Sequence, residues 1–298
     1  MDAFPLVLPP EAVPRLAALG GVFLALLTAG LLLDVALFVR WRRLGRLPAA
    51  RAWGALRARP WSGPEASALV CGWAGLNLAA GGAVALARRW FPAAGSRVAA
   101  AAVVWQTLVV PAALLLGVAA LLRRRRLTWS AAFARPGAGW RTAAARGAAS
   151  YLAVLPVFAL AAALYLGALS RLGYPLRSQE VIGLLTDPAQ PLWLQAYLCL
   201  VAVSVAPLIE ETVFRGILLP ALLKRFAPGA AVALVAFLFA LLHFHVPSLL
   251  PIFVLAVGLA LAYVWSGSLL AAIVMHALFN GFNLAAVLWL RDWFPAGP

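Results

Sequence analysis

The chain has 298 residues, of which 65% are hydrophobic and only 11% are charged. Soluble domains of this size usually contain about 45–50% apolar and about 25% charged residues. The composition therefore excludes a disulfide-stabilised secreted scaffold, a disordered protein and an ordinary cytosolic enzyme, and it predicts an integral membrane protein. Cys71 and Cys199 lie inside apolar tracts and indicate neither a disulfide nor a metal cluster.

A membrane-spanning helix needs about 20 apolar residues, because the hydrocarbon layer is about 30 Å thick. Stretches of that order predict an all-α, polytopic membrane protein of about eight transmembrane helices, since backbone in lipid must satisfy its own hydrogen bonds. We divide the chain into N-terminal membrane helices at 1–190, with arginine-rich loops, and a segment at 191–298 that carries the motifs described below. The predicted spans are 16–39, 66–87, 98–122, 147–170, 192–209, 229–245, 248–265 and 269–290.

The formal net charge is +15, and most of the basic residues form short clusters between apolar runs. This placement is typical of loops that flank membrane spans, so no nucleic-acid partner is expected. Seven arginines lie in 40–59 and seven in 123–146, against three in 88–97. The two richer loops are therefore predicted to be cytoplasmic, with both termini outside. Tryptophans interleave with these arginines, which fits interfacial helices on anionic headgroups and solvated loops with anchoring tryptophans equally well.

Ionisable residues inside membrane spans cost free energy and are functional candidates by default. All three histidines fall between 243 and 276, and two of the nine acidic residues are adjacent. The chemistry that the sequence offers is thus concentrated in the last third of the chain. The candidate catalytic residues are Glu210, Glu211, Arg215, His243, His276 and Asn280.

Helical spacing divides these candidates into roles. Glu211 and Arg215 are four residues apart, so they share a helix face and can form an ion pair. Glu210 points about 100° away from Glu211 and can face a cavity instead. Phe239 and His243 share a face by the same spacing, as do His276 and Asn280. One carboxylate, two imidazoles and one carboxamide, from three helices, can then converge on one polar chamber.

Two mechanisms use this set. In the first, Glu210, His243 and His276 bind Zn²⁺ and leave a coordination position open for water. In the second, Glu210 is the general base and no metal is needed. Asn280 would donate to the oxyanion in either case. Each residue also has a purely structural interpretation. The two acids could end a helix in solvent, each histidine could be a core residue, and Asn280 could bond between helices. The last role is also the one expected of Asn77 and Gln106. The functional prediction rests on the joint arrangement.

These residues resemble the motifs of the CPBP intramembrane proteases, a family that includes the type II CAAX prenyl endopeptidases and the Abi-type bacteriocin-immunity proteins. The family pattern is E-E-x-x-x-R, then F-x-x-x-H, then H-x-x-x-N or H-x-x-x-B, and the resemblance covers about 195–290. Here the motifs stand as Glu210-Glu-Thr-Val-Phe-Arg215, Phe239-Ala-Leu-Leu-His243 and His276-Ala-Leu-Phe-Asn280.

The resemblance implies an eight-helix fold with an intramembrane catalytic chamber open towards the cytosol. By motif position, Glu210 would activate water with help from His243. His276 and Asn280 would stabilise the oxyanion, while Glu211 and Arg215 would organise the site. Family members are described as metalloproteases, and a glutamate mechanism is the alternative. The alanine- and arginine-rich composition favours a bacterial plasma membrane protein, whose substrate would be a peptide or membrane protein other than a CAAX protein.

The predicted function is therefore that of an intramembrane endopeptidase. Two alternatives stay open on the sequence alone. A non-enzymatic immunity or scaffold protein could bind a peptide with the same groups. A proton-coupled transporter could use Glu210, His243 and His276 as a proton relay, although the absence of an internal repeat argues against it.

Overall fold

The computed structural model describes residues 10, 12–44, 49–91, 95–135, 137–176, 178–188 and 190–291. Helices make up the regular structure of these ranges, apart from one isolated bridge between Ala134 and Ser268. The all-α prediction is confirmed. The long helices are α1 (Ala12–Leu44), α3 (Gly63–Trp90), α4 (Gly95–Arg125), α6 (Trp140–Arg171), α12 (Leu249–Ser266) and α13 (Leu269–Leu290).

A further long path runs from 192 to 223 without a break, but it changes its helical type four times. Two π-helical turns, in which the hydrogen bond reaches one residue further than in an α-helix, interrupt it. In chain order the path consists of α8 (Leu192–Leu200), η2 (Val201–Val205), α9 (Ala206–Glu211), η3 (Thr212–Leu218) and α10 (Leu219–Leu223).

Seven helical segments in the described ranges are long and apolar enough to cross a membrane, and they match seven of the eight predicted spans. The remaining prediction, 229–245, is corrected. Here α11 (Pro228–Leu241) has 14 residues, about 21 Å at about 1.5 Å per residue, which is too short for a hydrocarbon layer about 30 Å thick. The chain turns after Leu241, and Phe244 takes a left-handed backbone conformation (φ 48°) that no helix continues through. The apolar sequence runs on through the turn, where Leu241, Phe244 and Val246 are exposed on the surface of the protein.

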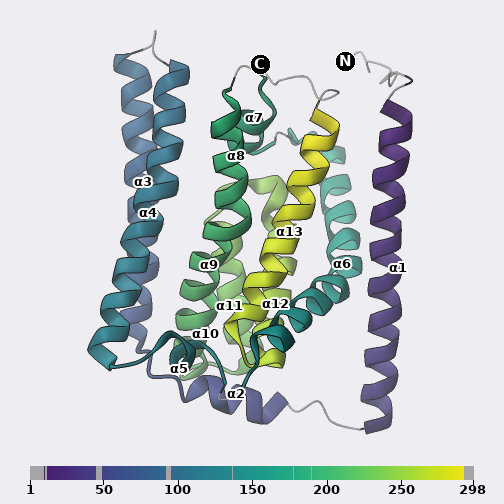
Figure 1. The fold of residues 1–298 in the computed structure, drawn as a ribbon, viewed down its shortest axis with the longest axis vertical. Helices are drawn as coiled ribbons and strands as arrows, with labels where there is room; N and C mark the ends of the chain where they lie inside the picture. Colours follow the sequence, from purple (N-terminus) through teal and green to yellow (C-terminus); the bar gives the residue numbers. More distant parts are fainter. Residues whose placement is uncertain are drawn as a thin grey trace.

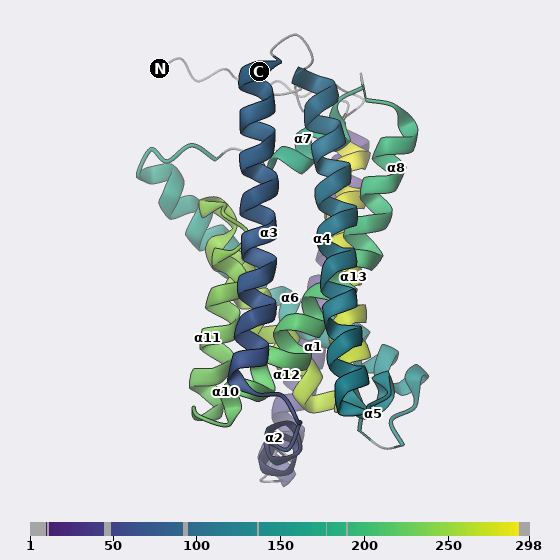
Figure 2. The same cartoon turned by 90° about the vertical axis from the view of Figure 1, so that its left-hand side faces the viewer.

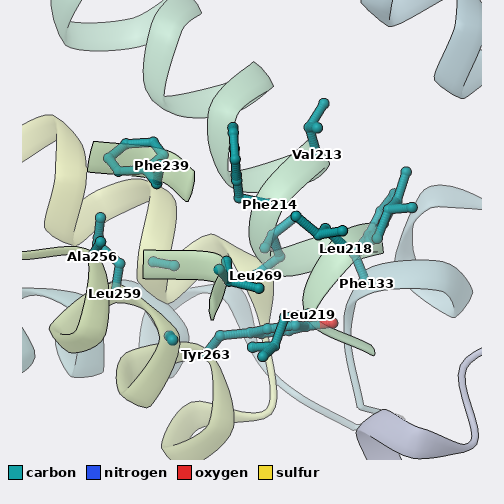
Figure 3. Packing of buried hydrophobic residues seen from close by; sticks show 14 of the residues in the cluster. Phe133, Val213, Phe214, Leu218, Leu219, Phe239, Ala256, Leu259, Tyr263 and Leu269 are labelled. Carbon is teal, nitrogen blue, oxygen red and sulfur yellow. The ribbon is translucent and has the colours of Figure 1, made fainter. Parts of the chain in front are cut away.

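The inner bundle consists of α6, α11, α12 and α13 together with the path from α8 to α10, while α1 packs on the outside against α6. Figure 2 shows α3 and α4 standing side by side as a pair in front of this bundle. One hydrophobic cluster contains residues from both sides of position 190, among them Tyr151 and Leu155 of α6 and Leu255 and Leu259 of α12. The N-terminal helices therefore share a core with the helices that carry the motifs. Figure 3 shows part of this cluster.

Four short elements complete the described chain: α2 (Ala49–Arg57), α5 (Trp129–Phe133), α7 (Glu180–Thr186) and η4 (Val246–Ser248). In Figure 1, α2 lies across the lower end of the bundle, where α5 also lies, and α7 lies at the opposite end. The buried Ala52 and Leu56 turn α2 towards the core, and Arg51 and Arg57 are exposed. This is the arrangement expected of an interfacial helix.

Close helix packing depends on glycine where α6 crosses α13. A Cβ atom at Gly147 would lie 2.5 Å from the carbonyl oxygen of Ala271 and 3.0 Å from Cβ of Val274. On the same helix, a Cβ at Gly167 would meet nothing within 4 Å. Small residues at such crossings let helix backbones approach in membrane proteins.

We expect Gly147→Ala to destabilise the folded protein by about 1–3 kcal/mol, because α6 must move away from α13. Gly167→Ala, which adds the same methyl group to an open position, should leave stability unchanged. Thermal unfolding of both variants in detergent measures this, and equal midpoints for the two variants would contradict the packing argument.

Candidate active site

The adjacent acids Glu210 and Glu211 end the short helix α9, with a π-helical turn on either side. A π-turn widens the helix and changes which side chains share a face, and such turns are frequent at functional sites. The two carboxylates consequently have very different surroundings: Glu211 is fully buried, and the Glu210 side chain is 17% exposed.

Glu211 is held by partners from two helical segments. The guanidinium of Arg215 donates through Nη1 to Oε1 of Glu211 at 2.9 Å, and both side chains are completely buried. His276 Nδ1 also lies 2.9 Å from Oε1 of Glu211. Because a carboxylate paired with arginine only accepts, His276 must carry its proton on Nδ1 in this contact. The pair predicted from the four-residue spacing is therefore present, with His276 as a third member.

Arg215 extends this network to two more helices. Its Nη2 donates to the carbonyl oxygen of Ala256 on α12 at 3.1 Å, and its guanidinium carbon lies 4.3 Å from the centre of the Phe239 ring on α11. These contacts compensate for part of the cost of removing the guanidinium from water.

The carboxylate of Glu210 differs from that of Glu211 in having no close partner in the described ranges. Within the described ranges, no side chain forms a hydrogen bond with it, and its Oε2 lies 3.9 Å from His276 Nε2. That separation is too long for a direct hydrogen bond and short enough for one water molecule to contact both atoms. The predicted ion pair of Glu211 is therefore present, and the catalytic role of Glu210 stays a prediction.

Phe239 connects the two histidines of the motifs. Its ring centre lies 4.8 Å from that of His243 and 6.0 Å from that of His276, both in edge-on geometry, and Phe214 packs on it at 5.1 Å. His243 lies in the turn that follows α11, with Nδ1 2.7 Å from the carbonyl oxygen of Phe239. Nδ1 therefore donates, which leaves Nε2 as the acceptor of the neutral ring.

A cavity of about 410 Å³ lies beside His243, between the end of α11 and the pair α3–α4. Two amides on its wall also bond to each other: Gln106 Nε2 donates to Asn77 Oδ1 at 2.7 Å. Both amides make the predicted contact between helices, and they also face the same space as His243, which was not predicted. The signal in the sequence was that Asn77 and Gln106 are polar residues inside apolar spans.

Asn280 has a different contact from the one that its predicted role requires. Its Nδ2 donates to the carbonyl oxygen of Ala202 in the π-turn η2 at 2.7 Å, and so joins α13 to the path that carries the acids. The amide has a second hydrogen. The oxyanion role stays a prediction, and it rests on that hydrogen.

Zinc sites in proteins use three or four His, Cys, Asp or Glu ligands. In the described part of the chain, no group of three or more such residues is placed so as to hold a metal ion. The His276 Nδ1 and His243 Nδ1 atoms are engaged by Glu211 and by Phe239. These contacts leave the Nε2 atom of each ring open, as in histidines that bind a metal through Nε2. The predicted ligand set of Glu210, His243 and His276 is not brought together in the described ranges, and we derive no catalytic step through a metal.

Residues 191–282 match the family model described as type II CAAX prenyl endopeptidase Rce1-like. The match contains all three motifs and confirms the family resemblance for this part of the chain. At the level of the family, it supports a membrane-embedded endopeptidase of the CAAX-protease type. No curated protein and no solved structure gives a significant match to the chain.

Removing one partner of the buried pair should be far more costly than removing one partner of an exposed pair. Arg215→Met leaves Glu211 as a buried charge with only His276 beside it, and we expect a loss of about 3–5 kcal/mol of stability. Arg125→Met breaks the exposed contact with Glu65, 2.8 Å long, and should cost at most about 1 kcal/mol. Unfolding in detergent measures both variants, and similar losses would contradict the assigned role of Arg215.

Elemental analysis of protein purified in detergent without chelator tests the zinc prediction. Because no three candidate ligands are brought together in the described ranges, we expect well under one zinc per folded chain, with no change in Glu210→Gln or His276→Ala. One zinc per chain in the wild type, lost in both variants, would establish the metal site and overturn our interpretation of these contacts.

Proposed function

We propose that the protein is an intramembrane endopeptidase in which Glu210 activates water. The proposal rests on one observation above all: Glu211 is committed to Arg215 and His276, while Glu210 keeps a free carboxylate 3.9 Å from His276 Nε2. A carboxylate beside a histidine can accept a proton from water at the moment of attack on a carbonyl.

In the proposed reaction, a water molecule lies between Glu210 and His276. Glu210 takes one of its protons while the water oxygen attacks the carbonyl carbon of a peptide bond, which gives a tetrahedral oxyanion. Glu210 then donates that proton to the departing nitrogen as the C–N bond breaks, and the products are a carboxylic acid and an amine. Each proton and each electron pair is accounted for without another reactant.

The neighbouring residues would orient and stabilise these steps. Glu211 fixes the His276 ring, and when that ring is doubly protonated its Nε2–H is directed to the side on which the oxyanion forms. A donor aimed at such an oxyanion is typically worth about 3 kcal/mol in other enzymes. Asn280 would supply a second donor with its remaining amide hydrogen. His243 would contact the substrate from the adjacent cavity.

The proposed substrate is a peptide or membrane protein. The cavity beside His243 has both apolar walls, such as Trp73 and Leu78, and the amide pair of Asn77 and Gln106. This combination suits a polypeptide segment, whose backbone needs hydrogen-bond partners inside a membrane. We further propose that the protein resides in a bacterial plasma membrane with its arginine-rich end in the cytoplasm.

Glu210→Gln should abolish hydrolysis, because the amide has the shape of the acid but cannot accept the proton. We expect a loss on the order of 10²–10⁴ in rate. The assay uses the full chain in phospholipid vesicles with a set of apolar peptides, including one with a farnesylated CAAX terminus, and products are detected by mass spectrometry.

Glu65→Gln is the matched control. It removes a carboxylate on α3 that binds Arg125 of α4 and Ser62, the residue before α3. It should cleave at the wild-type rate. Cleavage by Glu210→Gln at that rate would contradict the mechanism. Intact peptides throughout the set, with folded wild-type protein, would contradict the peptidase and favour a binding protein. A flux that depends on a pH gradient and is lost in Glu210→Gln would instead indicate a transporter.

A further inference from the structure

A second cavity, of about 370 Å³, lies at the arginine-rich end of the molecule, away from the acid pair. The end of α2, the start of α5 and the turn between α12 and α13 enclose it, at the end of the bundle where α2 and α5 lie in Figure 1. No carboxylate lines this cavity. Its lining residues are Ala52, Ala55, Leu56, Ala58, Arg59, Pro60, Ala131, Arg135, Tyr263, Val264 and Gly267.

The first arginine of this cavity is held rigidly. Arg59 donates through Nη1 to the carbonyl oxygen of Ala131 at 2.6 Å and through Nη2 to that of Ala134 at 3.0 Å. Its third donor, Nε, is buried and has no hydrogen-bond partner in the described ranges. Two carbonyl bonds orient the guanidinium and leave its charge without a counter-ion.

The second arginine lies flat on a glycine. A Cβ atom at Gly267 would be 2.8 Å from Nε of Arg135, so the guanidinium lies against the glycine backbone. Gly267 also ends α12 with a left-handed backbone (φ 70°), and its carbonyl oxygen accepts from the backbone nitrogen of Arg135 at 2.8 Å. The turn therefore fixes Arg135 at the mouth of the cavity.

The third group is a tyrosine hydroxyl. Tyr263 is fully buried, and its OH donates no hydrogen bond in the described part of the chain. In Figure 3 its side chain extends from α12 past Leu219 with the oxygen at the outer end. Arg59 is near enough to interact with the hydroxyl electrostatically. Arginine has no acceptor, however, so the hydroxyl hydrogen still lacks a partner.

Two cations, and a buried tyrosine hydroxyl that donates no hydrogen bond, favour an anionic acceptor in this cavity. Phosphate oxygens suit arginine and hydroxyl donors well. We propose that this cavity binds the phosphate group of an anionic phospholipid. The lipid source is favoured over free phosphate because the cavity opens at an end of the spanning helices, beside an interfacial helix. The rest of its wall is also apolar: Ala52, Ala55, Leu56, Pro60 and Val264 would contact the carbon chain next to the phosphate.

Native mass spectrometry of the delipidated full chain in a neutral detergent tests this, with dioleoylphosphatidylglycerol, dioleoylphosphatidylcholine and inorganic phosphate as separate probes. We expect one saturable phosphatidylglycerol site, at least about tenfold stronger than the site for phosphatidylcholine. Tyr263→Phe and Arg135→Gln should each weaken it about tenfold, since each removes a hydrogen bond to a charged group. Both variants should fold, because one keeps the buried ring and the other changes an exposed side chain.

Arg124→Gln is the matched control, because it removes the same charge from an exposed position at the same end without lining the cavity. It should change the affinity less than twofold. Equal losses in Arg124→Gln and Arg135→Gln, with no effect of Tyr263→Phe, would indicate diffuse surface charge and overturn the proposal. Inorganic phosphate that displaces phosphatidylglycerol at similar concentration would overturn the lipid assignment. Failure of all three probes would mean that the cavity holds only water.

Discussion

The ion pair between Glu211 and Arg215 determines how the centre of this protein is built. Two fully buried charges in a membrane protein need partners on every side, and here each partner comes from a different helix. Arg215 reaches Ala256 on α12 and the ring of Phe239 on α11, and Glu211 reaches His276 on α13. The pair thereby ties α11, α12 and α13 to the segment that carries the acids. Apolar packing alone holds helices weakly in lipid, because lipid tails are as apolar as the side chains.

The same pair explains why two adjacent glutamates can have different tasks. Oε1 of Glu211 accepts from two donors and the side chain is fully buried, so this carboxylate is held away from the water that Glu210 would activate. His276 is also oriented by this contact: with Nδ1 fixed on Glu211, its Nε2 is left on the Glu210 side. A buried ion pair and the carboxylate proposed to react are therefore linked through a single imidazole.

The sequence predicts whatever follows from hydropathy and regular helical spacing. It places seven spans and pairs Glu211 with Arg215, because both inferences need only local geometry. It fails where the backbone departs from that geometry. Span 229–245 ends early since Phe244 turns out of the helix, and the apolar residues after it hide the turn. The π-turns on either side of α9 have no signature in composition. Asn280 bonds to Ala202 in one of them, so its partner is a backbone carbonyl that no side-chain pattern reveals.

The π-turn η3 also lies between the acid pair and the second cavity. Arg215 points from it into the acid cluster, and the next residue, Gly216, meets Phe133 of α5, where a Cβ would lie 2.8 Å from the ring. The carbonyl oxygens of Ala131 and Ala134, at and just after α5, hold Arg59 at the second cavity. One buried segment thus positions Arg215 beside the acid pair on one side and contacts the element that holds Arg59 at the second cavity on the other.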